Sequence, residues 1–452
     1  MFRTLLIANR GEIALRIART ADRLGIRTVM VHSEADTGAP WLDAADRTVC
    51  VGPSKASASY LDLDAILQAA EQSDCQAVHP GYGFLSENPV FAAACIQQGL
   101  AFVGPGPGAM LVTGNKIRAK RAMAEAGVPV IPGSDGAVHD ADEAAALADR
   151  IGYPVLLKAA AGGGGKGMRA CAEPTALRAA FVEAANEADK AFGDPALYLE
   201  RLIVGGRHVE FQVLCDAFGG AIHLGERECS VQRNHQKLVE ESPSPALSPE
   251  ERSRFGERVA RAMAAIGYCN AGTVEFLRAP DGEMYFMEVN ARLQVEHPVT
   301  EVRTGVDLVE MQLRIAALEP LPLSQANVRF EGHGIELRIN AEDPDDGFRP
   351  DPGEITAFRA PPPEAGTARV RWDSAVRAGY RVPPYYDSLI GKLIVHAADR
   401  EGAIAGAVAA LDRTDLQGIK TTIPLHRKVL AHERFRSGQY DVGFLHAAGL
   451  AG

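Results

Sequence analysis

The chain has 452 residues, of which 46% are hydrophobic and 23% are charged, and its net charge is -11. This composition is ordinary for a globular protein of about three domains, and the acidic balance disfavours nucleic-acid binding, which requires a basic face. The seven cysteines show no CxxC spacing, and no apolar run approaches the ~20 residues of a membrane span. We therefore expect a reduced cytoplasmic protein with neither a nucleic acid nor a membrane as partner.

The first part of the chain alternates predicted strands and helices. Helical spacing follows Gly11, and the turn before it reads Asn-Arg-Gly-Glu, so the GxGxxG fingerprint of nicotinamide cofactors is absent. Such alternation predicts an open parallel α/β sheet. The apolar runs that we expect to form its strands are 4–8, 28–32, 76–79 and 101–103.

Further along the chain, the pattern predicts an inserted module and a separate last section. A helix over 114–126 should end at Gly127, because Pro129 lies just beyond it. The segment 132–204 resembles a small insertion, after which strands and hairpins return. A last section begins near residue 330, rich in strands and then helical over 403–411.

A glycine-rich loop lies between a predicted strand at 156–158 and a second predicted strand after it. Four consecutive glycines, Gly162–Gly165, lie between Lys158 and Lys166. Glycines let the backbone approach phosphate groups closely, so we interpret the loop as a flap over a nucleotide. The alternative is a flexible hairpin tip without a ligand, and the loop is no P-loop because neither Ser nor Thr follows Lys166.

A predicted hairpin brings two carboxylates together. If Asp281 and Gly282 form a two-residue turn, Glu275 lies directly opposite Glu288, with Asn290 on the same face. Like charges directly opposite one another are destabilising, and carboxylate and amide oxygens suit Mg²⁺. We therefore predict a metal site, the alternative being that both carboxylates face solvent.

The residues that follow this hairpin predict an anion site. Arg292, Gln294 and Glu296 would share one face if the strand continued. An arginine beside a glutamate is commonly only an ion pair, but next to a predicted metal strand we favour an anion site with an adjacent base. Cys229, in a polar run, is expected to be a buried structural thiol rather than a nucleophile.

Together these motifs resemble the biotin carboxylase family of ATP-grasp enzymes over essentially the whole chain. The resemblance implies an α/β protein with the ATP-grasp fold. Its parts would be an N-terminal open parallel α/β (preATP-grasp) domain at 1–113, an ATP-grasp domain at 114–329 with a mobile glycine-loop lid at about 132–204, and a C-terminal α+β domain at 330–448. The matching motifs lie at 7–14, 79–88, 162–168, 207–210, 226–241, 288–301, 338–344 and 384–388.

The resemblance also implies a role for individual residues. ATP would be bound by Lys116, Lys158, Gly164, Gly165, Glu200, Arg201, Leu202, Ile203, His208, Gln232 and His235, with Glu275 and Glu288 reaching it through the metal. Magnesium, or manganese, would be held by Glu275, Glu288 and Asn290. Bicarbonate would be bound by Lys237, Arg292, Gln294 and Val295. Glu296 would be the general base, Arg338 would steady the biotin enolate, and Tyr82 would lie near biotin.

The implied reaction is ATP-dependent carboxylation of biotin with bicarbonate through carboxyphosphate, the first half-reaction of an acetyl-CoA or acyl-CoA carboxylase. The expected partners are a carboxyltransferase and a biotin carboxyl carrier protein. Because no Met-Lys-Met motif is present, we expect the carrier to be a separate protein, the alternative being that this chain is a fragment. A homodimer is also expected, although Arg23 and the loop 361–367 depart from the family pattern at the dimer contact. The alternatives are another ATP-grasp ligase and a non-catalytic nucleotide-binding protein.

Overall fold

The computed structural model describes residues 1–159 and 168–451. The predicted flap glycines Gly164 and Gly165 therefore lie outside the described residues. The N-terminal part is a five-stranded parallel sheet in the order β3-β2-β1-β4-β5. Its strands are β1 (Thr4–Ile7), β2 (Arg27–His32), β3 (Arg47–Cys50), β4 (Ala77–His79) and β5 (Ala101–Phe102).

The predicted parallel sheet is thus confirmed, with one strand and one helix that the pattern did not indicate. β3 is an edge strand whose residues are mostly exposed, so it carries no apolar run. The helix before 116 is short and begins at a proline. The helices of this part are α1 (Gly11–Arg23), α2 (Leu63–Glu71), α3 (Pro89–Gln97), α4 (Pro107–Thr113) and α5 (Lys116–Glu125).

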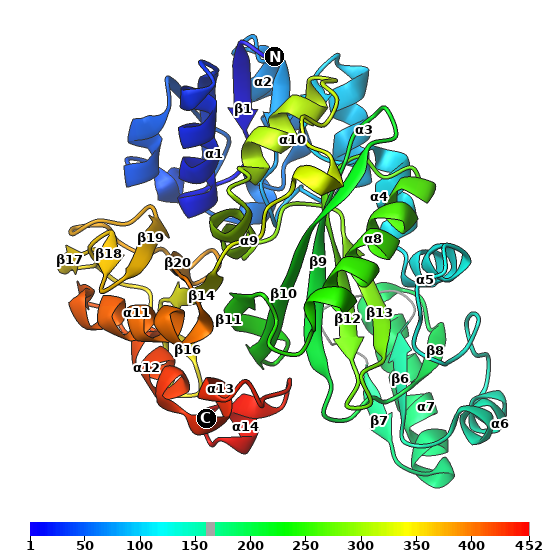
Figure 1. The fold of residues 1–452 in the computed structure, drawn as a ribbon. Helices are drawn as coiled ribbons and strands as arrows, with labels where there is room; N and C mark the ends of the chain where they lie inside the picture. The colour runs from blue at the N-terminus through cyan, green and yellow to red at the C-terminus, as the bar shows by residue number, and fades with distance from the viewer. Residues whose placement is uncertain (160–167, 452) are drawn as a thin grey trace.

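A three-stranded antiparallel sheet, in the order β7-β6-β8, forms the inserted module at the lower right of Figure 1. Asp140 caps the first of its two helices by accepting from the backbone N–H groups of Asp142 and Glu143. As predicted, strands flank the glycine loop on both sides. The elements are α6 (Ala141–Ile151), β6 (Val155–Ala159), β7 (Arg169–Cys171), α7 (Pro174–Phe192) and β8 (Leu197–Arg201).

The centre of the molecule is one nine-stranded antiparallel sheet, in the order β13-β12-β9-β10-β11-β14-β20-β19-β18. It crosses residue 330 without a break, because β14 pairs with β11 (Glu240 opposite Glu336). Its strands are β9 (Arg207–Cys215), β10 (Ala221–Arg233), β11 (Gln236–Ser242), β12 (Asn270–Arg278), β13 (Met284–Asn290), β14 (His333–Asn340), β18 (Glu364–Ala365), β19 (Ala368–Ser374) and β20 (Leu389–Ala397).

Helices pack against this sheet at several of its strands. α8 (Pro249–Ala265) begins with a capping box, in which Ser248 and Glu251 satisfy each other's backbone N–H groups, and it packs on β9 and β10. α9 (His297–Thr304) packs on β10, β11, β14 and β20, and α10 (Leu308–Ala316) lies against α1. The C-terminal helices are α11 (Arg400–Arg413), α12 (Ile423–Ala431), α13 (Glu433–Arg436) and α14 (Phe444–Ala447).

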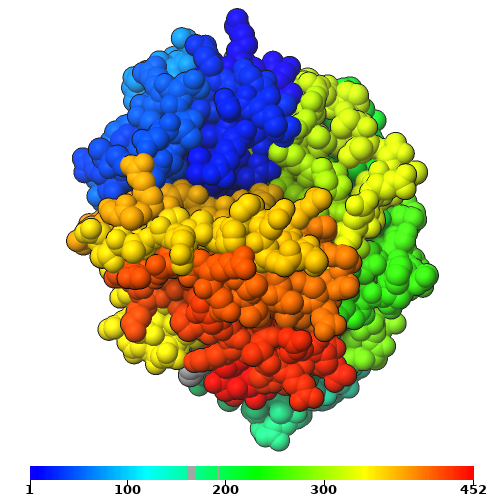
Figure 2. Space-filling view, turned by 60° about the vertical axis from the view of Figure 1, so that its left-hand side comes forward, coloured from blue at the N-terminus to red at the C-terminus, as the bar shows by residue number. Residues whose placement is uncertain are grey.

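The N-terminal part rests on the last section of the chain, as Figure 2 shows where the blue surface meets yellow and orange. Arg10 is one of the side chains at this contact. It binds Asp36 (Nε–Oδ2 2.7 Å), and its guanidinium lies between the rings of Trp41 and Tyr386. Short elements complete this section: β15 (Glu342–Asp343), β16 (Arg349–Pro350), β17 (Ala357–Arg359) and β21 (Asp415–Gln417).

Among residues 1–159 and 168–451, no helix combines the length and the apolar character needed to span a membrane.

Candidate active site

A cavity of about 1310 Å³ lies between the module of α6, α7 and β6–β8, the nine-stranded sheet and the loops after β1 and β4. Of the described residues predicted for the site, Glu296 is the exception that does not line it, since its side chain is fully buried. The others that line the cavity are Tyr82, Lys116, Lys158, Glu200, Arg201, Leu202, Ile203, His208, Gln232, His235, Lys237, Glu275, Glu288, Asn290, Arg292, Gln294, Val295 and Arg338.

The predicted carboxylate hairpin is present, although its turn differs from the prediction. Glu275 lies directly opposite Glu288, as predicted. The turn contains three residues, 280–282, and not two, because the Ala279 N–H donates to the carbonyl of Glu283 (2.8 Å). A register shift between Glu275 and Phe276 compensates, leaving Met287 as the extra residue of a β-bulge. Phe286 then packs in the core and Met287 faces the cavity.

Three lysines and a glutamate gather at the end of the cavity nearest α5. Lys158 Nζ lies 2.6 Å and Lys120 Nζ 3.1 Å from the two carboxylate oxygens of Glu200. Burial would raise the pKa of Glu200, but these two lysines outweigh it and lower the pKa. Lys116 is 3.9 Å from Glu288. Half-buried ammonium groups held at a cavity wall are suited to phosphate oxygens.

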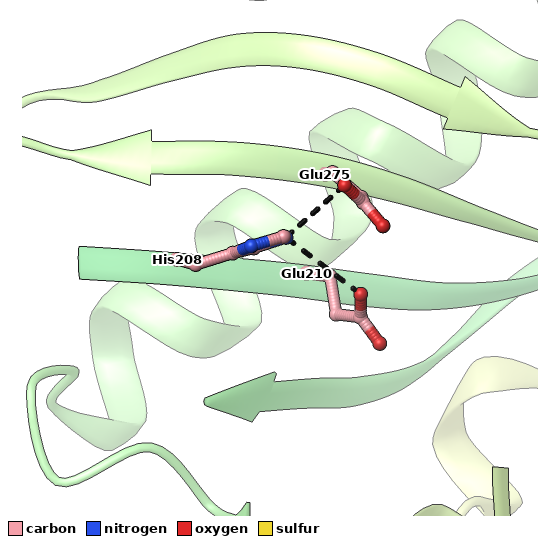
Figure 3. A group of neighbouring side chains, drawn as sticks. All are labelled: His208, Glu210 and Glu275. Carbon is pink, nitrogen blue, oxygen red and sulfur yellow. Dashed lines mark ion pairs between the residues drawn. The ribbon is translucent and has the colours of Figure 1, made fainter. Parts of the chain in front are cut away.

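His208 packs against the hairpin from the neighbouring strand β9, as Figure 3 shows. Its Nε2 is 3.1 Å from Glu275 and 3.9 Å from Glu210. Burial would lower the pKa of His208, but Glu275 outweighs it and the pKa is raised. These three side chains could share a metal ion by distance alone. In the structure, the cation beside Glu210 and Glu275 is the Lys237 ammonium group.

Lys237 joins three carboxylates from three different segments. Its Nζ lies 2.5 Å from Glu210 on β9, 2.8 Å from Glu275 on β12 and 2.6 Å from Glu296 at the start of α9. Burial would lower the pKa of Lys237, but the three carboxylates raise it well above the ordinary value. Lys237 is therefore a permanent cation in the floor of the cavity.

The segment after the hairpin is a turn, so the condition under which Arg292, Gln294 and Glu296 would share one strand face is not met. β13 ends at Asn290, and α9 starts at His297 with Pro298 in its first turn. Proline at that position favours a helix start and cannot donate in a strand. The turn nevertheless points Arg292 into the cavity.

The guanidinium group of Arg292 is oriented by its neighbours. Nε donates to Glu87 (2.9 Å), Nη1 to Gln294 (2.9 Å) and Nη2 to the Asn290 Oδ1 (3.1 Å). Glu87 also accepts from the Ala291 backbone N–H (2.8 Å), which fixes the start of the turn. A planar donor fork held at a cavity wall is suited to a planar anion.

Glu296 lies beneath two cations. Its Oε1 is bound by Lys237, and its Oε2 accepts from Arg338 Nη2 at 2.9 Å. Burial would raise the pKa of Glu296, but Lys237 and Arg338 hold it well below the ordinary value. Arg338 also donates to Glu240 (Nε–Oε1 2.6 Å), whose pKa burial raises to about 7.

Sequence reasoning missed four charged residues of the site: Lys120, Glu87, Glu210 and Glu240. Glu210 belongs to the motif at 207–210, but its contact with Lys237 depends on strand pairing that the local pattern does not reveal. Cys229 is fully buried, and burial raises the pKa of its thiol well above the ordinary value. It is therefore a structural thiol, as predicted, and not a nucleophile.

Three family models match the chain in succession. Residues 1–110 match the N-terminal domain of biotin carboxylase, residues 115–324 the ATP-binding domain of the carbamoyl-phosphate synthase L chain, and residues 336–447 the C-terminal domain of biotin carboxylase.

Curated relatives and solved structures are similar over the whole length. Biotin carboxylase 1 of Bacillus subtilis is 48% identical over 453 residues and covers 100% of both chains. The biotin carboxylase of Haemophilus influenzae is 48% identical over 98% of this chain and 98% of that protein. A structure of the Campylobacter jejuni biotin carboxylase with a β-γ-ATP ligand has a TM-score of 0.95, 47% identity and 99% coverage of each chain.

A further solved relative was crystallised with the ligands of interest. The biotin carboxylase domain dimer of Hydrogenobacter thermophilus 2-oxoglutarate carboxylase, in complex with MgADP, ADP and bicarbonate, has a TM-score of 0.93 and 46% identity, and it covers 99% of this chain and 98% of that chain. The cavity brings together the turn that carries Arg292, the carboxylate hairpin and the lysines, and the matches extend over the full length of the chain. The chain therefore belongs to the biotin carboxylase family of ATP-grasp enzymes.

Proposed function

We propose that this chain catalyses the ATP-dependent carboxylation of biotin by bicarbonate, with biotin attached to a separate carrier protein. The observation that supports this most directly is the meeting of Lys237 and Arg338 at Glu296. The Glu296 carboxylate, in contact with both cations, can accept a proton from bicarbonate in the first step. Its charge is then balanced by these cations when biotin reacts. The family membership supports the same reaction.

The nucleotide would bind at the end of the cavity that carries Lys116 and Lys158. The residues Glu200–Ile203 line the cavity beside it, and a base could bind to the backbone groups other than the Arg201 and Leu202 N–H groups, which donate to Pro132 and Pro154. Two carboxylates directly opposite one another, Glu275 and Glu288, together with the Asn290 oxygen, fit the hard-oxygen donor set of Mg²⁺ or Mn²⁺. Burial and Glu275 raise the pKa of Glu288, and a divalent cation between the two carboxylates would relieve that repulsion. Bound metal would neutralise charge on the transferring phosphoryl group.

Bicarbonate would lie beside Arg292, whose guanidinium is already oriented by Glu87 and Gln294. Lys237 and the backbone at Val295 border the same part of the cavity. Because bicarbonate carries one negative charge, it can replace one of the carboxylates around Lys237. We propose that it displaces Glu296 from that lysine.

This exchange would make Glu296 a better base. In the described arrangement its pKa is held low by Lys237 and Arg338, so it is ionised but weakly basic. If Lys237 turns toward bicarbonate, the pKa of Glu296 rises and the carboxylate can accept the bicarbonate proton. The deprotonated oxygen then attacks the γ-phosphate and ADP leaves, giving carboxyphosphate.

The second step would take place at the Arg338 side of the cavity. Carboxyphosphate breaks down to CO₂ and phosphate, and the phosphate takes the ureido N–H proton of biotin. The negative charge that develops on the ureido oxygen would be stabilised by the Arg338 guanidinium. Burial would lower the pKa of Arg338, but Glu240 and Glu296 outweigh it and keep the group charged. Tyr82 lines the same region. The biotin nitrogen then attacks CO₂.

The partners follow from the proposed reaction. The carboxyl group would pass from the carrier protein to a carboxyltransferase, and the final acceptor is set there, as relatives named for pyruvate and 2-oxoglutarate carboxylases indicate. We also propose a cytoplasmic homodimer. Arg23 stands where the family resemblance places the dimer contact. It is paired within its own chain to Asp307 (2.6 Å) and Glu310 (2.7 Å), and its side chain remains half exposed.

The test is phosphate release from Mg-ATP by the purified chain, with and without bicarbonate and with and without free biotin. We expect release to require bicarbonate and to rise with biotin, and radiolabelled bicarbonate to appear in carboxybiotin. Release that ignores both would indicate another ATP-grasp ligase. No release under any condition, with nucleotide still bound, would indicate a non-catalytic protein.

A further inference from the structure

Lys392 is a fully buried lysine outside the predicted site. It lies on β20 directly opposite Arg338 of β14 and Asp373 of β19. Side chains directly opposite one another project from the same face, and two cations so placed repel. Burying an ammonium group is strongly unfavourable unless it is paired and hydrogen-bonded. The groups that compensate this buried charge therefore indicate which parts of the structure Lys392 connects.

Those partners come from two distant segments of the chain that both line the cavity. Lys392 Nζ donates to the backbone carbonyl of Val295 (2.9 Å) and lies 3.1 Å from Glu12 Oε1. The same Glu12 oxygen accepts from the hydroxyl group of Tyr82, whose ring centroid is 5.9 Å from Lys392 Nζ. Glu12, Tyr82 and Val295 line the cavity, and Lys392 lies behind them.

The contacts do not resemble those of a lysine that only stabilises the sheet. The carboxylate directly opposite, Asp373, pairs with Arg371 instead (Nη2–Oδ2 2.6 Å). Lys392 extends to the turn that carries Val295 and Glu296, where its acceptor is a backbone carbonyl. It thereby connects that turn to the N-terminal part through Glu12, which lies in the first turn of α1.

We propose that Lys392 is a positioning residue that couples the biotin side of the cavity, at Tyr82, to the bicarbonate side, at Val295, through Glu12. This inference rests on the proposed function. Biotin arriving against Tyr82 changes the hydrogen bonding of Glu12, and Lys392 transmits the change to the turn that carries the base. ATP cleavage thereby becomes responsive to biotin.

The experiment compares Lys392→Met, Glu12→Gln and the double variant with the wild type. The quantity measured is the ratio of bicarbonate-dependent phosphate release with free biotin to that without it. We expect this ratio to fall about ten-fold in each single variant, as is typical of coupling between two sites. The double variant should lose no more than the worse single variant, because both act on one connection.

Two controls separate coupling from stability. The dissociation constant for ADP, measured by calorimetry, should stay within about two-fold of the wild type, since neither residue lies at the nucleotide end. Lys428→Met removes an exposed lysine that is paired only with Asp345 and should leave the ratio unchanged.

The outcomes distinguish this inference from the proposed function. A wild type whose phosphate release ignores bicarbonate and biotin would overturn the proposed function itself. A responsive wild type with an unchanged ratio in the variants would overturn the coupling. An equal fall of both rates, with the ratio preserved, would show that Lys392 only stabilises the fold and would also overturn it. If Lys392→Met does not fold, Glu12→Gln alone decides by the same ratio.

Discussion

Lys237, Arg338 and Glu296 form a buried group in which each charge is shared. Such a group contributes little to stability, because desolvation offsets most of the attraction between the charges. Removing one member, in contrast, leaves a charge without compensation. Dense buried charges in a cavity wall are therefore more typical of catalysis than of folding.

Glu296→Gln tests the proposed base. Glutamine keeps the volume but cannot accept the bicarbonate proton, so kcat should fall by at least about 10²-fold. ADP binding, measured by calorimetry, should persist, because Glu296 is outside the cavity lining. Turnover equal to the wild type would remove Glu296 from the mechanism.

Glu288→Gln tests the carboxylate hairpin. The change removes one of the two charges directly opposite one another, so the Mg²⁺ concentration for half-maximal phosphate release should rise at least about ten-fold. Glu283→Gln, at an exposed position of the same hairpin, is the matched control and should leave the titration unchanged. An unaltered titration in Glu288→Gln would contradict the metal assignment.

At the scale of elements, Glu241 at the end of β11 holds three segments together. It accepts from His333 of β14 (2.6 Å), from Arg400 of α11 (Nε, 2.7 Å) and from the hydroxyl group of Tyr440. Burial would raise the pKa of Glu241, but the hydrogen bonds from His333 and Arg400 hold it at about 2. The folded state therefore favours the ionised form more strongly than the unfolded state does.

The sign of the pH dependence follows from this lowered pKa. The stabilisation by Glu241 is fully present above the unfolded pKa of about 4.5 and is lost as the pH falls toward 2. Glu241→Gln should lower the free energy of unfolding by about 3 kcal/mol at pH 7, and by less at pH 3.5. Urea unfolding followed by circular dichroism measures both. Glu433→Gln, exposed on α13, should have little effect at either pH, and a pH-independent difference for Glu241→Gln would contradict the assignment.

In the hairpin of β12 and β13, the predicted pairing of Glu275 with Glu288 is correct although the turn and the register next to it differ from the prediction. The turn is one residue longer than predicted, and the bulge at Met287 restores the register before Glu288. The pairing of Phe276 with Phe286, whose ring centroids are 6.4 Å apart, explains the bulge, because burying Phe286 excludes Met287 from the core. The spacing of residues along the chain does not predict this bulge, because the bulge depends on packing between side chains in the core.

At the scale of the whole molecule, Arg10 joins a buried ion pair of the first part of the chain to Tyr386 of the last part. Arg10→Met should leave the buried Asp36 without its cation and lower the free energy of unfolding by about 3 kcal/mol. The fluorescence of Trp41, which is 1% exposed and 5.1 Å from the guanidinium, should change as well. Arg377→Met breaks an exposed ion pair with Asp43 in the same contact and should shift stability by less than about 1 kcal/mol. Equal effects of both changes would contradict a special role for Arg10.

The sequence predicted the parallel N-terminal sheet and the strands beside the glycine loop because both follow from local apolar patterns. All the predicted site residues that the structure describes line the cavity except Glu296, and many of them were predicted through resemblance rather than spacing. It could not predict the contacts of Lys237 with Glu210 or of Lys392 with Val295, since these join residues far apart in the chain. The strand does not continue to Glu296, as one face for Arg292, Gln294 and Glu296 would have required, because a helix with Pro298 in its first turn starts there instead.

The pairing of β11 with β14 has a practical consequence for anyone who divides this chain. A cut near residue 330 looks attractive because family models end and begin on either side of it. It would separate Lys237 from Arg338 and expose a bare strand edge on each fragment. Unpaired strand edges form hydrogen bonds with strands of other molecules, so each fragment produced alone should aggregate. Fragments produced together in one cell should instead associate through the β11–β14 pairing.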